Sequence, residues 1–380
     1  MDLQHDWSTD LPEERLSAIP ETFISMQRRV DGAHVGGDYV PADALNEGQR
    51  LAFDHVVECF RRHLRAAPGE DAHGNTIIMG TAGVGKSFLI RALETEIWHI
   101  AKDQFGKEAY PNVRTAIKLV AFTEKAAFQV GGVTIHSLLS IGNKLPVEQL
   151  PPERLRDLQR ELKNTHFLFI DEMSMVGLRM LNAIDHRLRA VFPANHDVPF
   201  GGLTVVMFGD FAQLPPVMDS ALYSRPIETS PTWAHHSSKL YNETFTHVFH
   251  LQQQMRQHGH TETELKFATL LAYLRTGEIN EDDWRFMQTR VLSQLPPDEA
   301  RLFQREALAL FPTNDQVRER NLRTLKSLHK PVARISAKYI GIKEREGSTL
   351  NEDYCGGMQH VLFLCVGARV LSNIAWLMER

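Results

Sequence analysis

The octapeptide GTAGVGKS, from Gly80 to Ser87, is the feature that most restricts what this chain can fold into. It has the spacing G-x-x-x-x-G-K-S of a phosphate-binding loop. The apolar run NTIIM before it predicts a buried strand, and Phe88, Leu89, Leu93 and Ile97 after it follow the period of a helix. Strand, glycine-rich turn and helix form the context in which this motif binds a nucleoside triphosphate. Because many unrelated proteins share the motif, it assigns no function by itself.

The loop predicts a nucleotide site with a role for each kind of residue in it. Its glycines let the backbone approach phosphate oxygens, and its N–H groups and the helix N-terminus face the anion. Lys86 would contact the β- and γ-phosphates, and Ser87 would hold Mg²⁺. The predicted cofactors are therefore ATP and Mg²⁺. The predicted nucleotide-binding residues are Gly80, Thr81, Ala82, Gly83, Val84, Gly85, Lys86 and Ser87.

Length and composition restrict the class of protein. The chain has 380 residues, which suggests two domains, and its 43% hydrophobic content is ordinary for a soluble globular protein. No apolar run approaches the length of a membrane span, and the acidic first residues do not resemble a signal peptide, so no membrane partner is expected. The three cysteines follow no disulfide or zinc spacing, which indicates a reducing compartment. With a net charge of −5, a nucleic-acid surface would have to be a local groove.

The order of predicted elements indicates an α/β fold. Strands are predicted over residues 76–79, 117–122, 167–170 and 203–208, with helices between them. This alternation favours a mostly parallel sheet with helices on both faces. After Pro231 the cycle begins again and predicts a second α/β lobe. Its predicted elements are the strand HVFHL at 247–251, helices from Glu264 and Asp282, the strand ALALF at 307–311 and a helix from Asp315.

Three polar residues follow predicted strands in positions suited to ATP hydrolysis. Asp171 and Glu172 end the apolar run HFLFI. Asp171 at a strand end would hold Mg²⁺, and Glu172 beside it would deprotonate the attacking water. Solvated carboxylates at a strand end are the alternative. Gln213, after the run VVMFGDFA, would contact the γ-phosphate or the water; by spacing alone, an ordinary loop glutamine is an equal alternative.

At this point several segments, taken together, resemble a known family. They occur in the order found in the petite-integration-frequency (PIF-type) DNA helicases, which belong to superfamily one and are RecD-like. Within that family, the sequences of these segments are most similar to the Helitron-associated branch. The segments are LNEGQRLAF, GTAGVGKSFL, AFTEKAAF, GGVTIHSLL, FLFIDEMSMV, FGGLTVVMFGDFAQLPPV, LQQQMRQ, LLAYLRTGEI, FPTN and VGARV, covering roughly residues 45 to 373. The resemblance implies a P-loop NTPase with two RecA-like lobes. Residues 1–44 would be a leader or linker, residues 45–226 the first lobe with the ATP site, and residues 227–380 a partial second lobe with the start of an inserted segment.

The resemblance also implies roles for single residues. Gln49 matches an adenine-reading glutamine, although Asn46 and Gln49 have the spacing of a helix capping box as well. Gln213 matches the γ-phosphate sensor. Arg256 matches an arginine that reaches the γ-phosphate from the second lobe. The expected catalytic residues are therefore Lys86, Glu172, Gln213 and Arg256.

The DNA contacts are implied by two further segments of the resemblance. Thr123, Thr134 and His136 match residues that line a single-stranded DNA channel, where such groups contact phosphates and do not read sequence. The first segment departs from the family pattern A-P-T-G, because Phe122 replaces the proline and Glu124 the glycine. A carboxylate at that position would repel the phosphate backbone.

The expected function is ATP-dependent 5′-to-3′ translocation on single-stranded DNA and unwinding of 5′-tailed duplexes, in DNA repair, recombination or telomere maintenance. The expected compartment is the nucleus, with the mitochondrion as the alternative. Two family motifs that follow VGARV elsewhere do not occur here, so the chain is expected to be C-terminally incomplete and, as it stands, a poor helicase. One alternative is a remnant that binds ATP and DNA without unwinding. Another is an unrelated P-loop NTPase, such as a nucleotide kinase.

Overall fold

The structure is a computed structural model that describes residues 40–65, 74–142, 149–255, 261–337 and 360–369. Two compact units make up the chain. Among the described residues, those up to 268 belong to the first unit and those from 269 onward to the second. Most of the expected leader therefore lies outside the described residues. None of the helices described is both long and apolar enough to cross a membrane.

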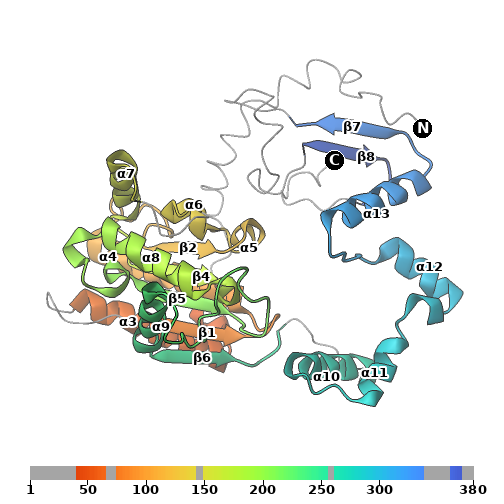
Figure 1. Cartoon of the computed structure of the whole chain (residues 1–380), viewed down its shortest axis with the longest axis horizontal. Helices are drawn as coiled ribbons and strands as arrows, with labels where there is room; N and C mark the ends of the chain where they lie inside the picture. The colour runs from red at the N-terminus through yellow and green to blue at the C-terminus, as the bar shows by residue number, and fades with distance from the viewer. Residues whose placement is uncertain (1–39, 66–73, 143–148, 256–260, 338–359, 370–380) are drawn as a thin grey trace. The chain divides into compact units, whose positions relative to one another are not determined.

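The first unit is built on a six-stranded sheet in the order β3-β2-β4-β5-β1-β6, with every neighbouring pair parallel (Figure 1). This confirms the predicted α/β class, and the strands predicted from apolar runs differ from the observed ones by only a residue or two at their ends. The strands are β1 (Thr76–Gly80), β2 (Ile117–Ala121), β3 (Val133–Thr134), β4 (Phe167–Asp171), β5 (Thr204–Gly209) and β6 (His247–Leu251).

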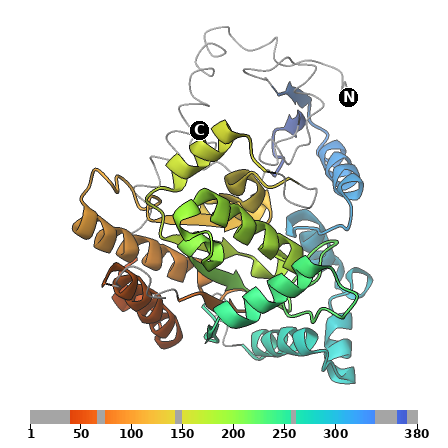
Figure 2. The same ribbon diagram turned by 60° about the vertical axis from the view of Figure 1, so that its left-hand side comes forward.

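Helices cover both faces of this sheet because successive strand residues point to opposite sides. In β5, Val205 and Met207 pack into one core, and Val206 and Phe208 into the other. The first core is closed by α6 (Ile135–Leu139), α7 (Pro152–Leu162), α8 (Leu178–Val191) and α9 (Thr232–Thr244), and the second by α3 (Glu47–Arg65) and α4 (Lys86–Phe105). A short helix, α5 (Glu124–Val130), follows β2. Both views show α9 beside α8 (Figures 1 and 2).

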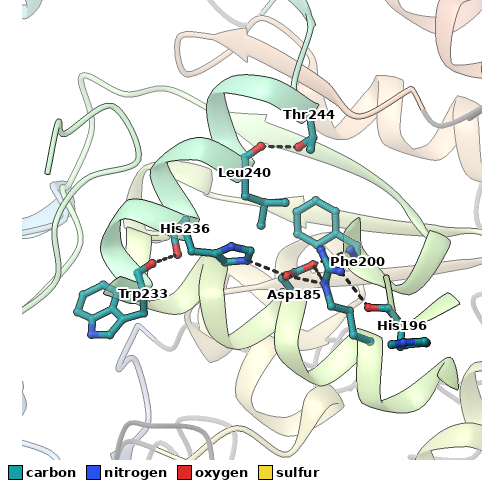
Figure 3. Close-up of polar contacts among 9 residues, drawn as sticks. Asp185, His196, Phe200, Trp233, His236, Leu240 and Thr244 are labelled. Atoms are coloured by element: carbon teal, nitrogen blue, oxygen red, sulfur yellow. Dashed lines mark hydrogen bonds and ion pairs between the residues drawn. The ribbon is translucent and has the colours of Figure 1, made fainter. Parts of the chain in front are cut away.

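The buried carboxylate of Asp185 connects helix α8 with the turn before β5 and with helix α9. Asp185 in α8 is 2% exposed, and its Oδ1 accepts a 2.7 Å hydrogen bond from the backbone N–H of Phe200. Arg189 donates its Nε to both carboxylate oxygens at 2.8 and 2.9 Å, and the Nε2 of His236 from α9 lies 3.3 Å from Oδ2 (Figure 3). Phe200 has a φ of 54°, which is uncommon for a residue with a side chain. Asp185 therefore holds the turn before β5 in place.

One predicted boundary is wrong. The strand HVFHL was expected to begin the second lobe, but as β6 it pairs with β1 from Thr76↔His247 to Gly80↔Leu251. The preceding helix α9 packs on α8, which also belongs to the first unit. This strand and helix therefore extend the first lobe beyond residue 226, because β1 has an open edge on the side away from β5, and β6 fills it.

The described part of the second unit contains four α-helices, a short 3₁₀ helix (Leu292–Gln294) and one antiparallel strand pair. The α-helices and strands are α10 (Glu262–Thr276, which begins in the first unit), α11 (Glu281–Gln288), α12 (Pro297–Glu306), α13 (Asn314–Ser327), β7 (Val332–Ser336) and β8 (Val361–Cys365). The predicted strand ALALF is wrong: residues 307–311 form no strand, and Leu308 and Leu310 are 81% and 96% exposed. A strand needs a partner for its backbone N–H and C=O groups, and no described strand pairs with this segment. A partial RecA-like lobe stays a prediction.

Candidate nucleotide site

The sheet order brings the predicted ATP-site residues to one edge. Strand β5 lies between β1 and β4, and all three are parallel. The phosphate-binding loop, the Asp171–Glu172 pair and the turn with Gln213 follow β1, β4 and β5, so they meet at the carboxyl edge of the sheet. This edge is where parallel α/β sheets bind ligands.

The loop itself has the predicted form. Strand β1 ends at Gly80, helix α4 begins at Lys86, and Gly85 between them has a φ of 81°. A Cβ atom on Gly85 would lie 2.3 Å from Nε2 of Gln49, so only glycine fits this position without displacing that side chain.

The carbonyl oxygens of this loop are all engaged. Each one from Gly80 to Gly85 accepts a hydrogen bond of 3.1 Å or shorter. The donors, in order, are Nζ of Lys86 for Gly80 and Thr81, Nε2 of Gln254 for Ala82, the N–H of Met255 for Gly83, Nε2 of Gln49 for Val84 and the N–H of Leu89 for Gly85.

The orientation of these carbonyl groups decides where the N–H groups point. In a planar trans peptide the C=O and the following N–H point in opposite directions. At Ala82, Gly83 and Val84 the donors come from outside the loop, so the N–H groups of the next residues turn to the other side of the loop, as a site for an anion requires. The residues present therefore fit the phosphate groups of a nucleotide.

Gln49 has a structural role at the start of α3. Its backbone N–H donates to Oδ1 of Asn46 over 2.9 Å, and its Oε1 accepts from the N–H of Asn46 over 3.1 Å. This is the reciprocal capping box that the spacing predicted. The side chain is buried, and its Nε2 also binds Val84 in the loop. The expected adenine contact stays a prediction.

The two carboxylates, Asp171 and Glu172, lie in different environments. Asp171 is 8% exposed, and this burial raises its pKa to about 6, although the Glu172 N–H and the charge of Lys86 oppose the shift. Glu172 is partly buried and has a φ of 54°, a strained conformation of the kind often found at functional sites. Gly209 at the end of β5 permits this turn, since a Cβ there would lie 2.8 Å from the backbone nitrogen of Met173. A divalent cation beside Asp171 would favour its ionised form.

Gln213 is partly buried in the turn after β5. Asp210, which was not among the predicted site residues, fixes this turn. The buried carboxylate of Asp210 accepts a 3.0 Å hydrogen bond from the N–H of Ala212. The carbonyl of Asp210 accepts another, of 2.9 Å, from the N–H of Gln213. Its position directly after the apolar run of β5 was the available signal.

The residues expected to contact DNA lie after β2 and β3, at the same edge of the sheet. The side chain of Thr123 caps α5 by accepting from the N–H of Ala126, and that of Thr134 caps α6 by accepting from the N–H of Ser137. The His136 ring is partly buried 5.4 Å from the Phe122 ring, and burial lowers its pKa. The capping roles are structural, and the DNA contacts stay predictions.

The described site ends at Met255, one residue before the predicted catalytic arginine. Arg256 lies outside the described residues. The two residues before it, Gln254 and Met255, bind the phosphate-binding loop, although neither was among the predicted site residues. The signal was their place in the segment LQQQMRQ, directly before an expected site residue.

Known proteins of one family are similar to this chain. The family model described as PIF1-like helicase matches residues 44–285. The chain is 33% identical over 233 residues to the ATP-dependent DNA helicase PIF1 of Saccharomyces cerevisiae, an alignment that covers 60% of this chain and 24% of that protein. It is 27% identical over 303 residues to the ATP-dependent DNA helicase Pif1 of Bdellovibrio bacteriovorus, covering 78% of this chain and 59% of that protein.

The fold also resembles a solved structure. The Pif1 helicase from Candida albicans has a TM-score of 0.56 and 23% identity to this chain, over 85% of this chain and 64% of that one. At this level of identity the likeness concerns the fold. The chain spans a quarter to three fifths of the length of these two curated relatives.

Proposed function

This chain belongs to the PIF1-like helicase family, and from this premise we propose that it is an ATP-driven DNA helicase that moves 5′ to 3′ on single-stranded DNA. The observation that carries the proposal is the convergence at one sheet edge. The phosphate-binding loop after β1 has every carbonyl from Gly80 to Gly85 engaged, and Asp171, Glu172 and Gln213 lie at the carboxyl ends of β4 and β5.

The proposed chemistry divides the site into binding and reacting groups. Residues Gly80 to Ser87 hold the phosphates of ATP, with Lys86 neutralising the β- and γ-charges, and Ser87 and Asp171 hold Mg²⁺. Glu172 takes the proton from the attacking water, and Gln213 orients that water. When bound, ATP supplies the phosphoanhydride whose hydrolysis drives movement. Gln49 would read the adenine, and Arg256 would stabilise the charge that develops on the γ-phosphate.

The proposed DNA partner is a single strand that passes over the carboxyl edge near β2 and β3. Thr123, Thr134 and His136 would contact its phosphates, which explains how the protein could bind without reading sequence. The overall charge of −5 and the carboxylate of Glu124 favour weak binding. A 5′-tailed duplex is the proposed substrate, and DNA repair, recombination or telomere maintenance in the nucleus or mitochondrion is the proposed setting.

The test measures coupling between ATP and DNA with the 380-residue chain. We expect single-stranded DNA to stimulate ATP hydrolysis, and strand displacement to occur on a 5′-tailed duplex but not on a 3′-tailed one. Lys86→Ala is the control and should abolish both. ATP hydrolysis that single-stranded DNA does not stimulate would favour another kind of P-loop NTPase. DNA-stimulated hydrolysis without displacement would favour a protein that binds both ligands but does not unwind.

A further inference from the structure

The turn after β6 is bound directly to the phosphate-binding loop. Strands β1 and β6 end side by side, with Gly80 opposite Leu251, so the residues after Leu251 run along the loop. The Nε2 of Gln254 donates to Oγ1 of Thr81 over 3.0 Å and to the carbonyl of Ala82 over 3.1 Å. The N–H of Met255 donates to the carbonyl of Gly83 over 2.8 Å.

The same turn also contacts the segment that holds the other end of the loop. The Nδ2 of Asn46 donates to the sulfur of Met255 over 3.7 Å. Asn46 forms the capping box with Gln49, whose amide binds Val84. The middle of the loop is therefore held from β6, and its end is held from α3.

We propose that Gln254 is a positioning residue of the nucleotide site. Its amide holds the peptide unit between Ala82 and Gly83 so that the Gly83 N–H faces the phosphates, and it thereby sets the affinity for the diphosphate part of a nucleotide. The inference rests on the proposed nucleotide-binding function. The orientation of the amide follows from chemistry, because only its NH₂ group can donate to the carbonyl of Ala82.

The surroundings of Gln254 distinguish this role from a stabilising one. Its side chain is exposed, so removing it should change the stability of the fold little. Its neighbours Gln252 and Gln253 are exposed on the same turn, and within the described residues neither side chain forms a hydrogen bond. They provide controls of the same residue type.

The experiment compares Gln254→Ala with Gln253→Ala in the full chain. Equilibrium binding of methylanthraniloyl-ADP and methylanthraniloyl-ATP is measured with Mg²⁺, together with kcat and KM for ATP and the melting temperature without nucleotide. We expect Gln254→Ala to weaken binding of both nucleotides by about threefold to tenfold, as for a lost hydrogen bond. KM should rise by the same factor while kcat stays within about twofold, because ground state and transition state lose the contact equally.

A second variant tests the donor itself. Gln254→Glu keeps the shape of the side chain but cannot donate to Ala82, and it adds a negative charge beside the phosphates. It should weaken binding more than Gln254→Ala does, with an unchanged melting temperature. Gln253→Ala should bind both nucleotides like the wild type.

Several results would overturn the proposal. Wild-type affinity for both nucleotides in Gln254→Ala would remove the positioning role. A loss confined to the ATP analogue would assign Gln254 to the γ-phosphate and not to the loop. A melting temperature lowered by several degrees would make the effect structural. If the wild-type chain bound neither nucleotide, the proposed function itself would fail, a result that is distinct from all of these.

Discussion

The ammonium group of Lys86 donates a 2.7 Å hydrogen bond to the carbonyl oxygen of Gly80, which ends strand β1. A second bond, of 3.1 Å, reaches the carbonyl of Thr81, and the charge of Lys86 also lowers the pKa of Asp171 against the larger effect of burial. One side chain therefore links the loop after β1 to the carboxylate after β4.

Lys86→Ala should reduce ATP turnover by about 100-fold or more and weaken nucleotide binding. In the proposed site the ammonium would be a preorganised positive charge at the phosphates, and removing one such group has effects of this size. Steady-state ATPase assays and binding of a fluorescent nucleotide measure the change. Lys102→Ala is the control, because Lys102 lies on the same helix α4 but contacts the Trp98 ring. Turnover close to wild type in Lys86→Ala would contradict the assignment of the loop.

Glu172→Gln should bind Mg²⁺ and ATP normally but hydrolyse ATP about 100-fold to 10,000-fold more slowly. Glutamine keeps the shape of the side chain and cannot accept the proton from water. Asp171→Asn should instead raise the Mg²⁺ concentration needed for half-maximal nucleotide binding. A titration of both variants with Mg²⁺ separates the roles. If Glu172→Gln shifted the Mg²⁺ dependence more than Asp171→Asn, the two roles would be exchanged.

Glu94→Gln should make the protein more stable at neutral and alkaline pH. Glu94 is 8% exposed, its Oε1 has no hydrogen-bond partner among the described residues, and burial raises its pKa to about 7 although Arg114 and Arg91 oppose the shift. Its folded pKa exceeds the ordinary value of 4.5, so folding takes up a proton between these pH values. The carboxyl therefore destabilises the fold progressively from about pH 4.5 upward, reaching about 3 kcal/mol above pH 7.

Urea denaturation at pH 5 and pH 8 tests this expectation. The free energy of unfolding of Glu94→Gln should exceed that of the wild type at pH 8 by more than at pH 5. Glu96→Gln is the control, since Glu96 lies on the same helix and forms an ion pair with Arg61 at the surface. An identical pH dependence in Glu94→Gln and the wild type would mean that Glu94 ionises freely in the folded protein.

Asp185→Asn should cost about 2 kcal/mol or more of folding stability, whereas Asp54→Asn should cost less than about 0.5 kcal/mol. Both aspartates pair with an arginine Nε at 2.8 Å and i,i+4 spacing, but the side chain of Asp185 is 3% exposed and that of Asp54 is 55% exposed. The Asp185 carboxylate also holds Phe200 and faces His236 (Figure 3). Equal losses in urea denaturation would show that burial does not decide the strength of these pairs.

The local parts of the fold could be predicted from the sequence. The apolar runs that became β1, β4 and β5, the loop between β1 and α4, and the capping box of Asn46 and Gln49 all depend on residues near one another in the chain. Each has a short pattern with a physical cause, either burial or the need to satisfy backbone N–H groups.

The predictions that failed concern features that depend on contacts between residues far apart in the chain. The run HVFHL was correctly predicted as a strand but placed in the wrong lobe, because nothing in five residues indicates which open sheet edge will accept them. The run ALALF has strand composition yet forms no strand, since composition does not supply a partner. Gln254 was missed for the same reason: its partner Ala82 lies 172 residues away.

The donors that engage the loop carbonyls have a consequence for the order of events during synthesis. Gln49 lies 35 residues before Val84, but Gln254 follows Ala82 by 172 residues. Contacts of such separation form after local helices and turns. The octapeptide therefore leaves the ribosome long before the turn after β6 can shape it. The affinity of a nascent chain for nucleotide should therefore rise once β6 has been made and has joined the sheet.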